Sequence, residues 1–447
     1  MTRILIENAT VVTLDDTNSI YHDAAILIDG DSIAAIGPGA ASMAADERLD
    51  VGGRVVMPGL YNAHTHAAMT FARGYAEDLP LDRWFNERIW RLESALTPEI
   101  VYWGTMLAIV EMIRGGVVGF GDHYFHMDRV AQAVTETGVR ANLAWAVFGS
   151  PAEEEVGTTI PLTVEFVRRT EGAAGGRLTA SLGPHSPYQC PDSFLARTAA
   201  VAVREGIGIH IHAAETAEQV QQSIATFDMS PIELLSHRGL FETHTIVAHA
   251  IHANDWDLDT LAQKDVNVVQ CPSTHLKYAM GVARVPDMME RGINVALGTD
   301  GAGSSTALNL WREARLAVLT QRQAHGDATL LGGAMPLHMA AGNGARALGF
   351  RKAGILAPGY AADLIVVDTT STHFRPLHDI IAALVWCTEP ADVCDVMVAG
   401  RWLMRDRQML TVDEGQVMAG FEQALEQVLG QPLTQFRRYT GAPVYQA

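Results

Sequence analysis

Lysine is almost absent from the sequence. Only Lys264, Lys277 and Lys352 occur among 32 basic residues, which face 51 acidic ones, so the formal net charge is 32 − 51 = −19. An acidic surface of this kind repels phosphate backbones and anionic lipid. We therefore expect no binding to nucleic acid or to membranes, and the expected partner is a small-molecule substrate.

Cysteine and long apolar runs are also scarce. The four cysteines show no Cys-x-x-Cys spacing, which is typical of reduced core residues in a cytosolic protein; they are Cys190, Cys271, Cys387 and Cys394. No apolar run approaches the ~20 residues needed to span a bilayer, and the N-terminus lacks a signal-peptide core. The expected location is the cytoplasm. The sequence does not determine the oligomeric state, and a homo-oligomer is compatible with it.

The 447 residues are 48% hydrophobic and 19% charged, a globular composition with room for one large domain and a smaller one. The smaller one is predicted from both ends of the chain. Apolar runs at 25–28 and 32–36 flank an Asp-Gly turn, which predicts a β-hairpin. Runs at 362–367 and 396–402 have the same character, and pairing the two ends avoids open sheet edges.

Between the ends, short apolar runs alternate with helical stretches, as in parallel βα proteins. The predicted strands are Val55–Tyr61, Val117–Gly121, Arg140–Val147, Leu178–Leu182, Ile207–Ile211, Thr245–Ala248, Val266–Gln270 and Asn294–Leu297. The predicted helices between them include Glu99–Arg114, Met127–Thr137, Ser193–Arg204, Asp255–Lys264 and Val285–Arg291. This pattern predicts an α/β fold: a (β/α)8 TIM-type barrel over 57–355 with a small composite β-sandwich domain formed by 1–56 and 356–447, the latter ending in a helix.

Polar side chains recur where each predicted strand ends. In chain order they are His64 and His66, Asp122 and His123, Trp145, His185, His212, His249, Ser273 and Asp300. Because barrel enzymes gather their chemistry at the carboxyl ends of the strands, we expect these side chains to surround one site.

The pair in His64-Thr65-His66 points to one face of a strand, since residues i and i+2 lie on the same side. Taken alone, such a pair favours two polar histidines near a turn over a metal site. With His212 and Asp300 at other strand ends, it predicts four ligands of a divalent ion. His210, two residues deeper, is interpreted as a core residue or the outer partner of a ligand. The alternative for Asp300 is a helix N-cap.

The scarcity of lysine bears on how many metals the site holds. Barrels with two metals often bridge them by a carboxylated lysine late in the fourth strand, and no lysine precedes Lys264. We expect one divalent ion, with zinc as the first candidate and iron(II) as the alternative, since the same donors bind both.

Water bound to such an ion becomes a nucleophile near neutral pH if a base takes its proton. Asp300 is predicted as that base, and Glu215, three residues past His212, as the carboxylate that carries the proton onward. The alternative for Glu215 is a first-turn helix residue favoured by the helix dipole. His249 is expected to orient the hydroxide or the substrate without binding the metal.

Six segments resemble the amidohydrolase superfamily, and most closely its branch of methylthioadenosine/S-adenosylhomocysteine deaminases. They are PGLYNAHTH (58–66), RGYAEDLPLDRW (73–84), GPHSPY (183–188), HAAET (212–216), AH (248–249) and GTDG (298–301). The resemblance, which covers essentially the whole chain, implies His64, His66, His212 and Asp300 as metal ligands, Glu215 as proton shuttle and His249 beside the reacting carbon.

The resemblance also implies a nucleoside pocket. Trp84 and Glu93 match positions that line it, the carboxylate being suited to a ribose diol, and His185 matches a substrate-contacting histidine. The residues alone equally allow Trp84 to be a helix-packing side chain and Glu93 a solvated helix charge.

Two departures from the family pattern stand out. Where dual-substrate members carry arginines for the homocysteine carboxylate, this chain has Trp145 within 143–150, followed by Glu153, Glu154 and Glu155. An aromatic residue among acids cannot pair with a carboxylate, which favours a neutral 5′-substituted adenosine over S-adenosylhomocysteine. His275 stands where relatives commonly have asparagine.

The predicted function is therefore metal-dependent hydrolytic deamination of an aminated heterocycle, first of all the adenine ring of 5′-methylthioadenosine, with release of ammonia. One alternative is a triazine-type chlorohydrolase or aminohydrolase on the same scaffold. The other is a non-catalytic binding protein, which would be expected to have lost the ligands that this sequence retains.

Overall fold

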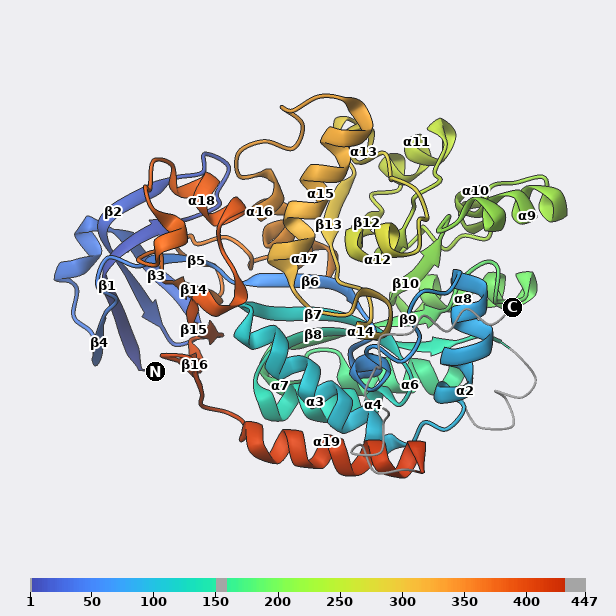
Figure 1. Ribbon diagram of the computed structural model, residues 1–447, viewed down its shortest axis with the longest axis horizontal. Helices are drawn as coiled ribbons and strands as arrows, with labels where there is room; N and C mark the ends of the chain where they lie inside the picture. The colour runs from blue at the N-terminus through green and yellow to red at the C-terminus, as the bar shows by residue number, and fades with distance from the viewer. Residues whose placement is uncertain (1, 150–158, 431–447) are drawn as a thin grey trace.

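Two β-sheets organise the molecule, a small one at one end and a barrel beside it (Figure 1). The computed structural model describes residues 2–149 and 159–430. Ser150, Glu153, Glu154 and Glu155, together with the last residues of the predicted C-terminal part, lie outside the described residues.

Strands from both ends of the chain build the small sheet. Its order is β17 (Gln408–Met409), β16 (Arg401–Arg405), β15 (Val393–Val398), β14 (Leu364–Val367), β5 (Val55–Pro58), β1 (Arg3–Val12), β2 (Ile20–Asp29) and β3 (Ser32–Gly37), with β4 (Glu47–Asp50) also on β1. The predicted hairpin is β2 and β3. The two ends meet where β14 runs antiparallel to β5, with Val367 opposite Val55. The prediction that both ends pair into one small domain is confirmed.

Eight parallel strands form the barrel. They are β6 (Leu60–Thr65), β7 (Val117–Tyr124), β8 (Arg140–Val147), β9 (Leu178–Pro184), β10 (Gly208–Ala213), β11 (Thr245–His249), β12 (Asn267–Gln270) and β13 (Asn294–Leu297). The segment after β13 returns beside β6, where the Asn62 side chain accepts from Thr299 N (2.9 Å) and donates to Thr299 Oγ1 (2.8 Å). The predicted (β/α)8 barrel is confirmed.

Helices cover the outside of the barrel (Figure 1). The longer ones are α3 (Pro98–Arg114), α4 (Met127–Thr137), α6 (Ile160–Thr170), α8 (Asp192–Glu205), α9 (Ala217–Phe227), α10 (Pro231–His237), α11 (Asp255–Gln263), α15 (Leu310–His325), α18 (Ile380–Trp386) and α19 (Glu414–Leu429). Shorter ones are α1 (Leu81–Arg83), η3 (Trp84–Ile89), α2 (Trp90–Glu93), α7 (Ala173–Gly176), α12 (Pro272–Lys277), α13 (Val285–Glu290), α14 (Ala302–Ser305), α16 (Met335–Ala340) and α17 (Gly342–Ala347). Within the described ranges, no single helix is long and apolar enough to cross a membrane, although the bent pair Leu81–Glu93 and Pro98–Arg114 passes that test together.

The predicted strand Val55–Tyr61 proves to be two strands in different sheets. β5 ends at Pro58 in the small sheet, and β6 begins at Leu60 in the barrel. A Cβ atom on the intervening Gly59 would lie 2.2 Å from Val118 Cγ1, so only glycine fits at this crossing. The prediction of one strand is wrong because the apolar pattern is the same on both sides of the glycine. The predicted domain boundaries stay predictions.

Candidate metal centre and substrate cavity

A cavity of about 890 Å³ lies at the carboxyl ends of the barrel strands. Its lining includes all of the predicted site residues except one; these are His66, Trp84, Glu93, His185, His212, Glu215, His249 and Asp300. The exception, His64, is fully buried beside them. The structure thus brings together in one place side chains that are spread over more than half of the sequence.

The histidine pair projects from the end of β6. His64 is the last but one residue of β6, and His66 is the first residue after the strand. Thr65 points the other way, and its hydroxyl donates to Gly121 O (2.9 Å) and to Asp122 Oδ1 (3.0 Å). Strand alternation and this anchor on the next strand leave both rings on the barrel interior.

The Nδ1 atoms of His64, His66 and His212 each have a partner on the side away from the cluster. His64 Nδ1 lies 2.9 Å from His210 Nε2. His66 Nδ1 lies 2.7 Å from His123 O, and His212 Nδ1 lies 2.8 Å from His185 O. Outer partners of this kind fix the ring orientation and leave Nε2 for a ligand. His210 supports His64 from behind, as its depth in β10 suggested.

Asp300 closes the cluster from the end of β13. Its Oδ1 lies 3.2 Å from His66 Nε2 and 3.6 Å from His64 Nε2, while its Oδ2 accepts from the Ser304 hydroxyl at 2.7 Å. The Asp300 backbone has φ 60°, a left-handed conformation that is uncommon outside glycine and turns the carboxylate toward the rings. The residue before α14 is Gly301, so Asp300 does not act as the helix N-cap.

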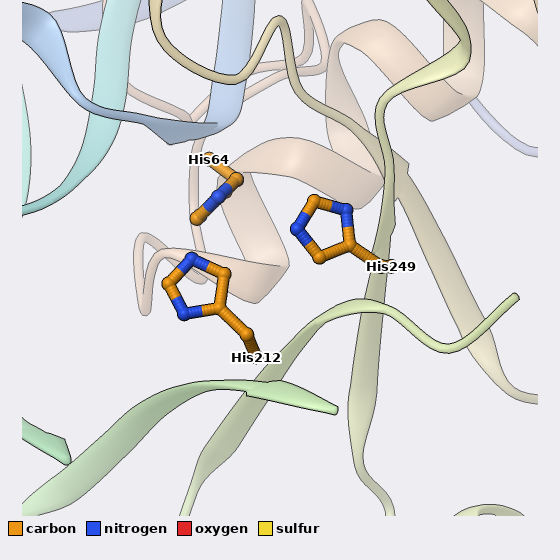
Figure 2. A group of neighbouring side chains, drawn as sticks. All are labelled: His64, His212 and His249. Atoms are coloured by element: carbon orange, nitrogen blue, oxygen red, sulfur yellow. The ribbon is translucent and has the colours of Figure 1, made fainter. Parts of the chain in front are cut away.

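The donor set fits a divalent ion. Two ligands at the usual zinc distance of about 2.1 Å in a tetrahedral site stand roughly 3.4 Å apart, close to the 3.2 Å between His66 Nε2 and Asp300 Oδ1. His64 Nε2 is buried without a hydrogen-bond partner among the described residues, as expected of a ligand nitrogen. Figure 2 shows the rings of His64, His212 and His249 turned toward one common space, their ring nitrogens within 4.8 Å of one another.

The electrostatics of the cluster suit a cation. Burial lowers the pKa of His64 to about 4 and the pKa of His212 well below its usual value, so both rings are neutral near pH 7. Burial opposes charge on His66 as well, but the contact with Asp300 outweighs it and raises the pKa of His66 to about 9. The rings of His64 and His66 hold the pKa of Asp300 well below its usual value despite its burial.

Glu215 and His249 form the side of the cavity next to the donor cluster. Ala214, with φ 49°, follows β10 and turns the chain so that Glu215 precedes α9, which Thr216 caps. Glu215 Oε1 lies 3.7 Å from His249 Nε2. On its other side His249 Nδ1 lies 3.1 Å from His275 Nε2, so His275 is the outer partner of His249.

Trp84 and Glu93 line another part of the cavity, called the far wall below. Trp84 is only 7% exposed, and its indole Nε1 has no partner among the described residues. Glu93 ends α2 and accepts from the Tyr124 hydroxyl at 2.7 Å. Burial raises the pKa of Glu93 to about 7. Both side chains line the cavity, and the Trp84 ring also packs against Tyr278 with centroids 5.6 Å apart.

Trp145 does not lie beside the cluster, contrary to the expectation. Its ring packs edge-on against Phe166 of α6 with centroids 5.4 Å apart, on the outer face of β8. Its neighbour Ala146 and the following Phe148 line the cavity instead, and Phe148 stacks on His185 with centroids 4.7 Å apart. Strand alternation explains the error, because adjacent residues of β8 face opposite sides.

The sequence analysis gave no role to several cavity residues. His123 lines the cavity, and its Nδ1 is buried without a partner in the described part of the chain. Tyr124 holds Glu93, and Tyr188 donates to Glu215 Oε2 at 2.5 Å. His123 and Tyr124 lie just past the predicted strand Val117–Gly121, which is a signal in the sequence, whereas no spacing in the sequence links Tyr188 to Glu215.

A closed (β/α)8 barrel with a histidine and carboxylate cluster at its carboxyl end defines the class of TIM-barrel proteins that hold a reactive centre on their strand ends. Within that class the chain belongs to the amidohydrolase family, whose model matches residues 55–403.

Named relatives match over nearly the whole chain. A 5-methylthioadenosine/S-adenosylhomocysteine deaminase from Pelotomaculum thermopropionicum is 42% identical over 422 residues, covering 94% of this chain and 97% of that protein. An adenosine deaminase from Xanthomonas campestris, solved with bound zinc, has a TM-score of 0.90 at 31% identity and covers 96% of this chain and 98% of that one. An atrazine chlorohydrolase from Arthrobacter aurescens TC1, solved with zinc, has a TM-score of 0.85 with coverage of 94% and 100%. At 23% identity, this last likeness concerns the fold alone.

Proposed function

We propose that the protein is a metal-dependent hydrolytic deaminase that acts on the adenine ring of 5′-methylthioadenosine, or of a related neutral 5′-modified adenosine, and releases ammonia. The observation that carries the proposal is one cavity that brings Glu215, Trp84 and Glu93 together with the cluster of candidate metal donors. The relatives named as deaminases support the same reaction.

His64, His66, His212 and Asp300 would hold one divalent ion. Zinc is the first candidate, supported by the zinc-bound relative, and iron(II) is the second because imidazole and carboxylate donors accept both. When bound, such an ion lowers the pKa of a coordinated water to about 7 and would thereby supply a nucleophile at neutral pH.

The side chains around the cluster handle protons. Exchange of a ring amino group for the oxygen of water moves one proton from water to a ring nitrogen and another to the departing amine. Asp300 lies within the donor cluster and is assigned as the base that takes the first proton. Glu215 is assigned to carry it, since its Oε1 faces the cavity beside His249. His249 Nε2 is placed to orient the oxygen that attacks.

The far wall suits a neutral nucleoside. The Trp84 indole offers a flat surface and an N–H donor to a purine, and the Glu93 carboxylate can accept from both hydroxyls of a ribose. His185 packs against His212 of the donor cluster and stacks on Phe148.

The described lining of the cavity offers no basic side chain of lysine or arginine to a 5′ carboxylate. No lysine or arginine is among the described residues that line it, whereas Asp82 and Glu218 are. The segment 150–158 also contains no basic residue in the sequence. Because Trp145 faces away from the cavity, it does not carry the predicted preference for 5′-methylthioadenosine over S-adenosylhomocysteine. That preference rests on the charges of the cavity.

The test is turnover by the zinc-loaded protein. With 5′-methylthioadenosine we expect release of ammonia and an ultraviolet shift toward the inosine analogue. For S-adenosylhomocysteine we expect a kcat/KM at least about tenfold lower than for 5′-methylthioadenosine, since its charged group loses its pairing. No turnover of any 5′-modified adenosine would refute the substrate. Chloride release from a chlorinated triazine without any ammonia release from aminated rings would refute the deaminase reaction.

A further inference from the structure

The two carboxylate oxygens of Glu215 have different surroundings. Oε2 accepts a hydrogen bond from the Tyr188 hydroxyl at 2.5 Å. Oε1 faces His249 Nε2 at 3.7 Å, on the side of the donor cluster. One oxygen is therefore held by the protein, and the other is left for a reacting partner. The Tyr188 hydroxyl proton is committed to this bond.

Tyr188 is itself well anchored. It lies in the turn after β9, where Ser186 is fully buried and its carbonyl accepts from Cys190 N at 3.0 Å. A tyrosine side chain has only two rotatable bonds, whereas a glutamate has three and loses more freedom when it is fixed. Tyr188 thus brings a rigid donor from β9 to a flexible carboxylate that follows β10.

Other contacts to Glu215 are weaker. Gln219 Nε2 lies 3.5 Å from Glu215 Oε2, at the outer limit for a hydrogen bond, because the Gln219 carbonyl oxygen is occupied by Thr216 N at 3.0 Å in the capping box of α9. Of the hydrogen bonds to the Glu215 carboxylate in the described structure, the one from Tyr188 is the short one.

We propose that Tyr188 is a positioning residue, which holds Glu215 so that Oε1 rather than Oε2 transfers the proton. The inference rests on the proposed function, in which Glu215 moves that proton. Proton transfer requires heavy atoms about 2.6–3.2 Å apart, and a misplacement of about 1 Å can cost about 100-fold in rate. Without the hydrogen bond from Tyr188, the Glu215 side chain occupies several rotamers, and only some of them present a carboxylate oxygen to the substrate ring.

The experiment is Tyr188→Phe in the zinc-loaded, full-length protein, assayed by ammonia release from 5′-methylthioadenosine. We expect kcat to fall about 10- to 100-fold and KM to change by less than about threefold, with zinc content and thermal midpoint as in the parent protein. An unchanged kcat would overturn the proposal. If KM is also unchanged, Tyr188 has no role in the reaction, and if KM is raised, Tyr188 acts in substrate binding.

Two further variants isolate the mechanism. Tyr102 makes the same kind of bond, to Glu136 Oε2 at 2.5 Å, on helices α3 and α4 away from the cavity, so Tyr102→Phe removes an equivalent hydroxyl and should leave kcat unchanged. In a Glu215→Gln background, Tyr188→Phe should cost less than about threefold, since residues that act as a unit are not additive. A full additive loss there would show that Tyr188 acts independently of Glu215.

The two proposals fail in different ways. If the parent protein releases no ammonia from any 5′-modified adenosine, the proposed function is refuted and the role of Tyr188 with it. If the parent protein is active and Tyr188→Phe matches it, the role of Tyr188 alone is refuted.

Discussion

Two polar clusters are buried in this molecule, one at each end of strand β6, and they differ in how completely their atoms are paired. At the amino end, Asp363 accepts from Arg140 Nε (2.6 Å), Arg140 Nη2 (3.0 Å), Ala399 N (2.8 Å) and the Tyr61 hydroxyl. At the carboxyl end, His64 Nε2 and His123 Nδ1 are buried with no partner in the described structure.

The difference separates a structural cluster from a reactive one. Buried polar groups are nearly always paired, because an unpaired one costs about 1–3 kcal/mol. The Asp363 cluster follows that rule and ties the small sheet to the barrel. The histidine cluster departs from that rule, and its buried nitrogens converge as the donors of a metal site do. Tyr61 and His64 are only three residues apart, so one strand serves both purposes.

Removal of metal should give the largest effect and should act on the histidine cluster alone. After chelation we expect kcat for 5′-methylthioadenosine to fall at least about 1000-fold, since the nucleophile is lost, while the far-ultraviolet circular dichroism is retained. Added zinc should restore activity. Full activity in protein that elemental analysis shows to be free of metal would contradict the assignment.

Disruption of the other cluster should destabilise the fold and leave the chemistry intact. Arg140→Met leaves the Asp363 carboxylate and the Tyr61 hydroxyl buried without their cation, and we expect the free energy of unfolding to fall by about 3–5 kcal/mol. The kcat of the folded fraction should not change. The matched control is Arg346→Met, which removes an exposed pair with Asp265 and should cost less than about 1 kcal/mol. Equal losses in the two variants, measured by urea titration, would refute the distinction.

The smallest effect concerns the far wall of the cavity. Because burial raises the pKa of Glu93 to about 7, its carboxylate takes up a proton as the pH falls through that value and can no longer accept from two hydroxyls. We expect KM for 5′-methylthioadenosine to rise about tenfold below the midpoint, while kcat changes less. A bound cation nearby moves this midpoint to lower pH.

The variant Glu93→Gln supplies the control for this pH dependence. It should have a raised KM at every pH and should lose the dependence, because the amide does not titrate. A pH profile of KM that is the same in both proteins would assign the titration to another group.

Much of this architecture could be read from sequence because it depends on local pattern. Strand Asn294–Leu297 and helix Met127–Thr137 have the predicted bounds, and each follows from an apolar run or a helical period bounded by turn residues. The convergence of His64, His66, His212 and Asp300 could be predicted because the barrel brings all strand ends to one face.

The parts that could not be predicted depend on relations between segments. Trp145 faces outward because of the inside–outside parity of β8, which the apolar run 143–147 around it does not reveal. Tyr188 meets Glu215 across 27 positions of sequence, through the pairing of β9 with β10. The position between the two sheets requires Gly59 because a Cβ atom there would collide with Val118, which is far away in the chain.

The pairing of β5 with β14 has a consequence for synthesis on the ribosome. Val55 finds its partner Val367 only after some three hundred further residues have been made. Chains fold from the N-terminus as they emerge, so the barrel strands are all available before the small sheet can be completed. Until then β5 presents an unpaired apolar edge of the kind that joins other chains. The nascent protein therefore passes through a stage in which aggregation competes with folding, and β14 ends that stage.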